Sequence, residues 1–261
     1  MKTIGKQQIV FSLKLMGIVP GDTLFVHSAL SSIGNVDGGA DAVIDALLEA
    51  VGEDGTVAVS TLSFGHPFCA ETTPTGVGAI SETFRKRPEA KRSLSPILSI
   101  AAIGAKAEYL VRDHEEYLNA CGLGSPYTKL RDMDAKILLL GVDMNRNTTL
   151  HAIEDIMNSC YLEKRAVPAP TYMKGYKGKE ITLEKFPPGH RDFLRSTPIL
   201  RRAGALTDGY IGNAVVKVIS VKKMFGVLIE KIADEPLYFM CDNPACEYCA
   251  NAHKLLEQER R

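Results

Sequence analysis

Short apolar, β-prone runs that alternate with amphipathic helix patterns constrain the fold of this chain more than any other feature. The run at residues 136–142, KILLLGV, lacks polar alternation, so we expect a strand buried on both faces. Helix patterns, in which apolar residues recur every three or four positions, lie at residues 41–52 and 79–86. These patterns predict an α/β fold with a central mixed sheet flanked by helices on both faces. The strands that we expect are residues 23–26, 55–60, 99–103 and 136–142.

The later part of the chain has a different pattern. Residues 172–179 are polar with glycine at the turn, which is typical of a hairpin, and residues 191–203 have a helical pattern that Pro198 must kink or split. We therefore expect a smaller C-terminal α+β portion. The organisation that we expect is one domain, residues 1–261, with a core of about residues 1–165 and a variable portion of about residues 166–261.

Charge and composition exclude several classes of protein. The chain has 31 basic and 31 acidic residues, whereas nucleic-acid-binding proteins usually carry a basic excess, so we expect no nucleic-acid partner. No segment has the roughly 18 uninterrupted apolar residues of a membrane helix, and the N-terminal pattern is an amphipathic helix ending at Gly17, without a cleavage site. The six cysteines in a chain of this size are not the pattern of a small disulfide-bonded scaffold. We expect a cytoplasmic protein without a membrane partner.

Two polar segments could bind an anionic ligand. Ser28, Ser31 and Ser32 follow the first expected strand, and a loop of small hydroxyl residues exposes backbone N–H groups that suit a phosphate or a pantetheine chain. Thr73 and the pair Arg92-Ser93 precede another apolar strand and could line the same kind of pocket. The alternatives are an ordinary strand-to-loop junction and a surface arginine–serine pair.

The segment after the strand at 136–142 carries a candidate catalytic base. Asn147 or Thr148 is a natural N-cap, so a helix should begin at the carboxyl edge of the sheet, where open α/β sheets bind ligands. Glu154 and Asp155 follow His151 by three and four residues and can share its helical face. A carboxylate beside the imidazole fixes the tautomer and raises basicity, as a general base requires. The alternative is a structural histidine in the first turn of a helix.

Short motifs occur in one order along most of the chain. They are Val26-His27-Ser28-Ala29-Leu30, Gly38-Gly39, Gly55-Thr56, residues 72–85, 92–99, 122–126 and 138–154, and the glycine-rich residues 204–214. In this order and spacing they resemble the aminoglycoside 3-N-acetyltransferase family, which is unrelated to the GNAT acetyltransferases. Any one motif is weak, but the set is hard to explain by chance.

The resemblance implies an acyltransferase that uses acetyl-CoA as co-substrate and acylates an amine of an aminocyclitol or amino sugar. It implies that His151 is the general base and that Thr148 helps to stabilise the oxyanion. Glu154 would orient His151 or contact the acceptor, and Asp192 is the candidate for a further carboxylate of the family. The residues that would bind the CoA arm are Ser28, Ser31, Ser32, Thr73, Arg92 and Ser93. Direct attack on the thioester needs no acyl-enzyme, and no sequence feature pairs Cys121 or Cys160 with an activating base.

The charge of the chain bears on the acceptor. Enzymes that capture polycationic antibiotics tend to be acidic, whereas this chain is neutral and has many lysines between residues 164 and 185. An amino sugar, for example a nucleotide-linked and anionic one, therefore fits better than an aminoglycoside. A CoA- or sugar-binding scaffold without catalysis is the alternative function, and a homodimer is left open.

A separate group of residues near the C-terminus has metal-ligand spacing. Cys241, Cys246, Cys249 and His253 could form a tetrahedral structural zinc site, since Cys-x2-Cys is a frequent ligand pair. The alternative is a set of reduced cysteines in a loop and helix. We expect no metal ion in the catalytic site.

Overall fold

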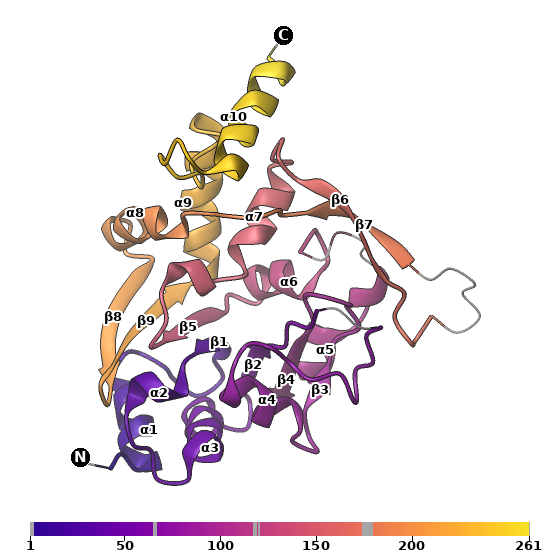
Figure 1. The fold of residues 1–261 in the computed structure, drawn as a ribbon. Helices are drawn as coiled ribbons and strands as arrows, with labels where there is room; N and C mark the ends of the chain where they lie inside the picture. The colour runs from indigo at the N-terminus through magenta and orange to yellow at the C-terminus, as the bar shows by residue number, and fades with distance from the viewer. Residues whose placement is uncertain (1–2, 65–66, 117–118, 120, 174–179, 261) are drawn as a thin grey trace.

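A seven-stranded mixed sheet forms the centre of the protein in the computed structural model, which describes residues 3–64, 67–116, 119, 121–173 and 180–260 (Figure 1). The strand order is β3-β4-β2-β1-β5-β9-β8. Strand β1 pairs in parallel with both β2 and β5, and the other neighbours are antiparallel. The strands are β1 Thr23–Ser28, β2 Thr56–Ser60, β3 Lys91–Arg92, β4 Ile100–Gly104, β5 Lys136–Leu140, β8 Leu206–Ile211 and β9 Ala214–Ser220.

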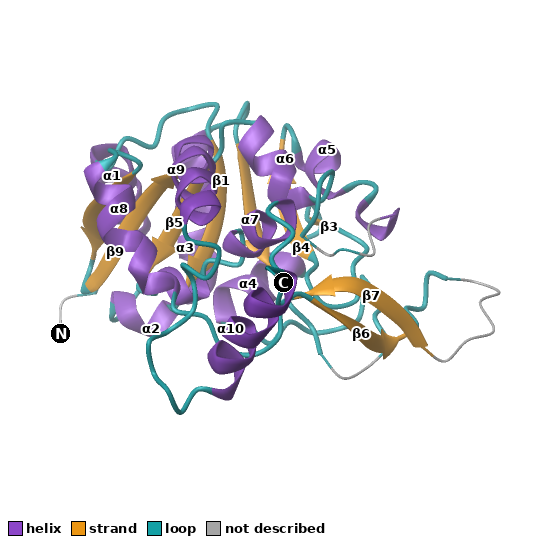
Figure 2. Ribbon diagram, turned by 90° about the horizontal axis from the view of Figure 1, so that it is seen from above, coloured by secondary structure: helices purple, strands orange, loops and turns teal. Residues whose placement is uncertain are grey.

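Side chains that alternate along the central strands divide the interior into two apolar cores. In β1, Phe25 points into one core, and Leu24 and Val26 point into the other. Helices α1, α3 and α4 cover the face of Leu24, while α5, α6, α7 and α9 cover the face of Phe25 (Figures 1 and 2). The expected α/β fold with helices on both faces is therefore confirmed, and the four expected strands are present.

The described α-helices range in length from 4 residues in α2 to 14 residues in α9. The α-helices are α1 Lys6–Leu15, α2 Leu30–Ile33, α3 Gly39–Val51, α4 Ala79–Arg85, α5 Ala107–Val111, α6 Pro126–Asp132, α7 Leu150–Ile156, α8 Ser196–Arg202, α9 Val221–Asp234 and α10 Glu247–Glu259. The 3-10 helices are η1 His114–Glu116, η2 Met144–Arg146 and η3 Phe193–Arg195. Within the described ranges, no helix has the length and apolar content needed to cross a bilayer.

The C-terminal portion contributes to the central sheet as well as to a separate small one. Strands β8 and β9 form one edge of the central sheet, whereas β6 (Glu163–Pro168) and β7 (Glu180–Phe186) make an antiparallel pair of their own. Of the hairpin expected at 172–179, residues 174–179 lie outside the described residues. The helical pattern at 191–203 is split into η3 and α8, with Pro198 in the first turn of α8, where its missing N–H is not needed.

Gly141 ends β5 in a conformation and at a distance that exclude a side chain. Its φ is +70°, and a Cβ there would lie 2.4 Å from Cβ of Ser32, whose hydroxyl donates to the Gly141 carbonyl at 3.0 Å. We predict that Gly141→Ala lowers the free energy of unfolding by about 2–4 kcal/mol. Gly226, in the exposed face of α9 with open space around it, is the matched control, and Gly226→Ala should raise stability by about 0.5–1 kcal/mol. Urea unfolding measures the change in the free energy of unfolding of each variant. Equal changes in both variants would contradict the packing argument.

Candidate active site

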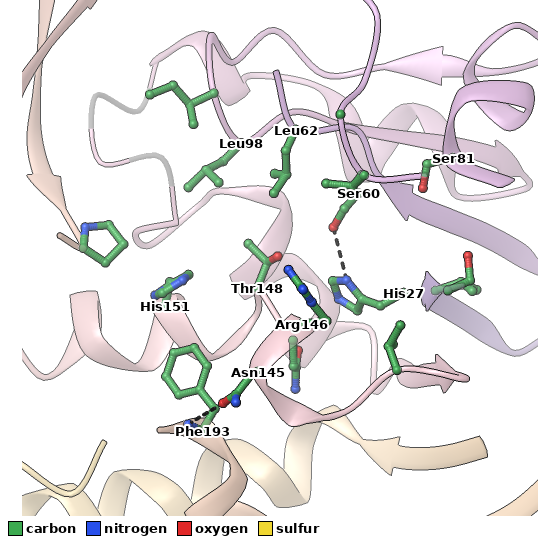
Figure 3. A pocket seen from close by; sticks show the side chains of 18 of the residues that line it. His27, Ser60, Leu62, Ser81, Leu98, Asn145, Arg146, Thr148, His151 and Phe193 are labelled. Atoms are coloured by element: carbon green, nitrogen blue, oxygen red, sulfur yellow. Dashed lines mark hydrogen bonds between the residues drawn. The ribbon is translucent and has the colours of Figure 1, made fainter. Parts of the chain in front are cut away.

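A cavity of about 550 Å³ lies at the carboxyl ends of β1, β2 and β5 (Figure 3). Parallel strands that end at one edge bring residues from distant parts of the chain together there. The cavity is lined by His27 and Ser28 from β1, Ser60 from β2, Ser81 from α4, Thr148 and the segment 145–147, His151 from α7, and Phe186, Pro187 and Phe193 from the C-terminal portion, among others.

The segment after β5 enters α7 through an extra turn. A 3-10 helix, Met144–Arg146, follows the strand, and α7 begins at Leu150 with Thr149 as its N-cap. The expectation that Asn147 or Thr148 caps α7 was therefore wrong. The Asn147 side chain instead accepts a hydrogen bond from the backbone N–H of Thr149, at 3.2 Å, and so shapes the turn before the helix.

His151 and Glu154 form a hydrogen-bonded pair in the cavity wall. Nδ1 of His151 lies 2.6 Å from Oε2 of Glu154, and the His151 ring packs edge-on against Phe193 with 5.2 Å between ring centroids. The Glu154 side chain is fully buried, whereas that of His151 is 22% exposed. Glu154 can therefore orient the imidazole, but its burial keeps it from contacting an acceptor.

Two further side chains hold the Glu154 carboxylate. Nε of Arg191 donates to Oε1, and the Tyr161 hydroxyl donates to the same oxygen at 3.0 Å. The Arg191 guanidinium also lies over the Tyr161 ring, 4.4 Å from its centroid. Burial alone would raise the pKa of Glu154, but the interactions with His151 and with the Arg191 guanidinium outweigh it and hold the pKa below its ordinary value.

The ionised carboxylate decides which imidazole nitrogen can accept a proton. Because Glu154 can only accept at Oε2, Nδ1 of His151 carries the hydrogen. The other nitrogen, Nε2, then has a free lone pair, and His151 lines the cavity (Figure 3). The arrangement can remove a proton from a nucleophile bound in the cavity.

The other predicted catalytic residues are divided between the cavity and its surroundings. Thr148 is buried and lines the cavity beside His151. Asp155 is not part of the cavity lining; its Oδ1 lies 3.9 Å from Nζ of Lys185, and burial raises its pKa. Asp192 does not line the cavity, and its backbone N–H donates to the Phe239 carbonyl at 2.8 Å. Of the predicted carboxylates, Glu154 is thus the partner of His151.

Most of the residues expected to bind the CoA arm make structural contacts. Ser28 lines the cavity, but Ser31, Ser32, Thr73, Arg92 and Ser93 are not part of its lining. The Arg92 guanidinium donates to the carbonyls of Thr61, Ala70 and Thr73 at 2.9, 3.2 and 2.5 Å. The Ser93 hydroxyl lies 2.8 Å from Nδ1 of His114. These contacts support a role in shaping the loop before α4, while a CoA contact by these residues stays a prediction.

Sequence reasoning missed Arg191, Tyr161 and His27. Arg191 and Tyr161 contact the carboxylate that holds the base, although Arg191 is adjacent to the predicted Asp192. His27 lines the cavity, and among the described residues its buried Nε2 has no hydrogen-bond partner, while Nδ1 lies 3.5 Å from the Ser60 hydroxyl. The histidine in the Val-His-Ser motif was the signal that could have identified His27.

Burial of His27 predicts a pH-dependent stability. Burial lowers its pKa from 6.5 to about 3, so the unfolded chain binds the proton more tightly than the folded one. The folded state therefore loses stability as pH falls below about 6.5, by about 2 kcal/mol between pH 7 and pH 5. Between pH 7 and pH 5, we expect the free energy of unfolding of His27→Gln to fall by about 2 kcal/mol less than that of the wild type. Exposed His253, replaced in the same way, is the control, and an unchanged slope in His27→Gln would refute the assignment.

The C-terminal cysteines lie apart from the cavity and group with a different histidine. Ligand atoms of Cys241, Cys246, Cys249 and His190 all lie within 4.8 Å of one another. The expectation that His253 completes this set was wrong, because His253 lines a separate surface hollow with Arg195 and Tyr238. His190, which is 59 residues from Cys249 in sequence, takes the fourth position of the set instead.

The fold and the cavity define an α/β protein with a carboxylate-oriented histidine placed for acid–base chemistry. The family model described as aminoglycoside 3-N-acetyltransferase matches residues 25–233. The chain belongs to this family. As a member it is an acyltransferase, and its co-substrate is acetyl-CoA.

Individual relatives agree with this assignment. The aminoglycoside N(3)-acetyltransferase IV of Salmonella sp is 28% identical over 241 residues, which cover 90% of each chain. The YokD protein of Bacillus subtilis strain 168, described as aminoglycoside N(3')-acetyltransferase-like, is 37% identical over 57% of this chain and 64% of its own. A crystal structure of a histidine-to-alanine mutant of AAC(3)-IVa in complex with a gentamicin superposes with a TM-score of 0.89 at 27% identity, covering 97% of this chain and 98% of the other.

Proposed function

We propose that this enzyme transfers the acetyl group of acetyl-CoA to an amine of an aminoglycoside or other amino sugar, with His151 as the general base. The observation that carries the proposal is the 2.6 Å contact of His151 with the buried Glu154 in the wall of the cavity. The complexes of AAC(3)-IVa mutants with a gentamicin and with apramycin support an amine acceptor of this class.

The step is a direct transfer between two bound substrates. The amine nitrogen attacks the thioester carbonyl carbon, and its proton passes to Nε2 of His151 as the C–N bond forms. The C–S bond then breaks, and the CoA thiolate leaves and takes up the proton that Nε2 of His151 holds, which returns the imidazole to its neutral form. Glu154 stabilises the imidazolium that exists between these events, and the hydroxyl of Thr148, a residue of the cavity wall, donates to the developing oxyanion in this proposal.

The cysteines of the chain do not favour an acyl-enzyme route. None of the described residues that line the cavity is a cysteine. Burial raises the pKa of the Cys121 thiol well above its ordinary value, and it also raises the pKa of Cys160. Since the thiolate is the nucleophile, both residues are poor candidates for a covalent intermediate.

The charge of the cavity favours an acceptor that is not a polycation. Arg146 lines the cavity with an exposed guanidinium, whereas none of the described lining residues is a carboxylate. The lysines that first indicated an anionic acceptor contribute less, because Lys164 pairs with Glu184 at 2.8 Å and Lys185 lies beside Asp155. Lys174, Lys177 and Lys179 lie outside the described residues. Arg146 therefore favours an amino sugar with an anionic substituent.

An acceptor panel tests the reaction and the charge preference together. Release of the CoA thiol would be followed with acetyl-CoA and glucosamine, glucosamine 6-phosphate or an aminoglycoside, using the wild type and Arg146→Gln. We expect turnover with at least one amine, and a preference for the phosphorylated sugar that Arg146→Gln reduces. If the aminoglycoside is turned over faster than the phosphorylated sugar, and Arg146→Gln leaves this rate unchanged, the charge argument is rejected but the reaction is not.

The same panel separates the enzyme from a scaffold that only binds CoA or a sugar. Calorimetric binding of CoA without turnover of any amine would favour the scaffold. A binding protein has no need for an oriented base, so the Glu154–His151 pair supports catalysis.

A further inference from the structure

Three sulfurs and one imidazole, none of them in the cavity lining, converge near the start of the C-terminal helix α10. His190 comes from the loop before η3, Cys241 and Cys246 from the segment between α9 and α10, and Cys249 from the first turn of α10. Sγ of Cys241 lies 3.4 Å from Sγ of Cys249, and Nδ1 of His190 lies 3.9 Å from that same sulfur. Four potential ligands from three separate segments of chain thus lie around one point.

These separations match the edges of a tetrahedral zinc site. Zinc–sulfur bonds of about 2.3 Å and zinc–nitrogen bonds of about 2.0 Å place ligand atoms roughly 3.5–3.8 Å apart in a tetrahedron. The distances of 3.4 and 3.9 Å fall close to that range, and the longest separation in the set is within 4.8 Å. A disulfide between Cys241 and Cys249 would instead need sulfurs about 2.05 Å apart and would leave Cys246 and His190 without a role.

The surroundings of the sulfurs suit thiolate ligands. The backbone N–H of Cys241 donates to Sγ of Cys249 at 3.2 Å, and the backbone N–H groups of Cys249 and Tyr248 point to Sγ of Cys246. Such N–H groups stabilise negative charge on metal-bound sulfur. Gly189, at φ +59°, lets the Tyr248 ring pack on the backbone next to His190, where a Cβ would lie 2.3 Å from the ring.

We propose that Cys241, Cys246, Cys249 and His190 bind one structural zinc ion. Binding displaces the protons of the three thiols and requires a neutral imidazole. With four protein ligands, the coordination sphere is closed, so the ion has no open position for substrate and its role is structural.

The site ties the C-terminal helix to the segment that supports the catalytic pair. His190 is followed directly by Arg191, whose guanidinium donates to Glu154 and to the carbonyls of Pro188 and His190 at 2.7 Å. By fixing His190, the zinc ion would fix the backbone from which Arg191 reaches Glu154. The ion is therefore also a positioning element for the acyltransferase site.

Metal analysis of the full-length protein, purified without chelators, tests the site. We expect about one zinc per chain by plasma mass spectrometry, and six titratable thiols after denaturation in chelator. His190→Ala should lose most of the zinc, whereas His253→Ala, which changes the histidine nearest the cysteines in sequence, should keep it. Zinc content far below one per chain, four thiols instead of six, or loss of zinc in His253→Ala but not in His190→Ala would each overturn the proposal.

The wild type provides a test that does not depend on the folding of a variant. Removal of zinc by a chelator should lower the melting temperature and increase hydrogen exchange at residues 187–193, and added zinc should reverse both changes. Helix α1, on the far face of the sheet, is the internal control for exchange. A chelator-treated protein that has lost its zinc without these changes would overturn the structural role.

Discussion

Replacement of His151 by alanine is expected to lower kcat/KM for amine acetylation by about 100- to 10,000-fold, the range that general base catalysis contributes. Without the imidazole, the attacking amine has no acceptor for its proton within the cavity, because His27, the other histidine of the lining, is held neutral by burial, with a pKa of about 3. The affinity for CoA should stay near that of the wild type. Steady-state kinetics and calorimetric titration of CoA measure the two quantities separately.

The matched control for this prediction is His253→Ala, since His253 is exposed and lines a separate hollow. Its kcat/KM should equal that of the wild type. A loss of less than tenfold in His151→Ala, with CoA binding intact, would show that another group removes the proton. A loss of CoA binding in His151→Ala would assign His151 to the binding of the co-substrate.

Breaking the buried ion pair between Arg191 and Glu154 should have the largest effect on stability. The side chains are 5% and 0% exposed, so Arg191→Met leaves a buried carboxylate without its guanidinium partner. The expected loss in the free energy of unfolding is about 3–5 kcal/mol at pH 7. Guanidinium unfolding of the wild type and Arg191→Met measures this loss.

The pH dependence of that loss follows from the pKa of Glu154. In the wild type the pKa lies below its ordinary value, so the pair stabilises the fold above the ordinary carboxyl pKa and this contribution disappears as pH falls through the folded value. Without Arg191, burial raises the pKa, the carboxyl can become protonated, and the deficit should shrink as pH falls from 7 toward 4. The loss of stability in the double variant Arg191→Met/Glu154→Gln should be about 1–3 kcal/mol smaller than the sum of the losses in the two single variants. Strict additivity would contradict a direct interaction.

The central strands could be predicted from sequence because they are apolar on both faces. The run at 136–142 contains β5, and its side chains from Ile137 to Leu140 are all buried. Strands β8 and β9 were not predicted. Strand β8 is the edge strand, several of its residues are exposed, and its sequence LTDGYI has the composition of a turn. An edge strand has a weaker apolar pattern than a central one, because it pairs with another strand on one side only and often has one face exposed to solvent.

The site could be predicted only where its residues are close in sequence. The spacing of His151 and Glu154 in one helix was sufficient to identify the pair. Arg191 reaches Glu154 across 37 residues, and His190 approaches Cys249 across 59, so no local pattern indicated either contact. The choice of His253 over His190 shows the same limit, because spacing along one helix favoured a nearby residue over one that only the fold brings to the cysteines.

The position of β5 in the sheet also affects how the chain folds while it is being synthesised. Strand β5 lies between β1, which is made long before it, and β9, which is made long after it. At ~5–20 residues per second, the ribosome needs on the order of ten seconds to reach β9 after completing β5. During that time the backbone edge of a largely apolar strand has no partner on one side, and such edges pair readily with other chains. A transcript or protein truncated before Ala214 would therefore release a polypeptide prone to aggregation rather than a smaller folded enzyme.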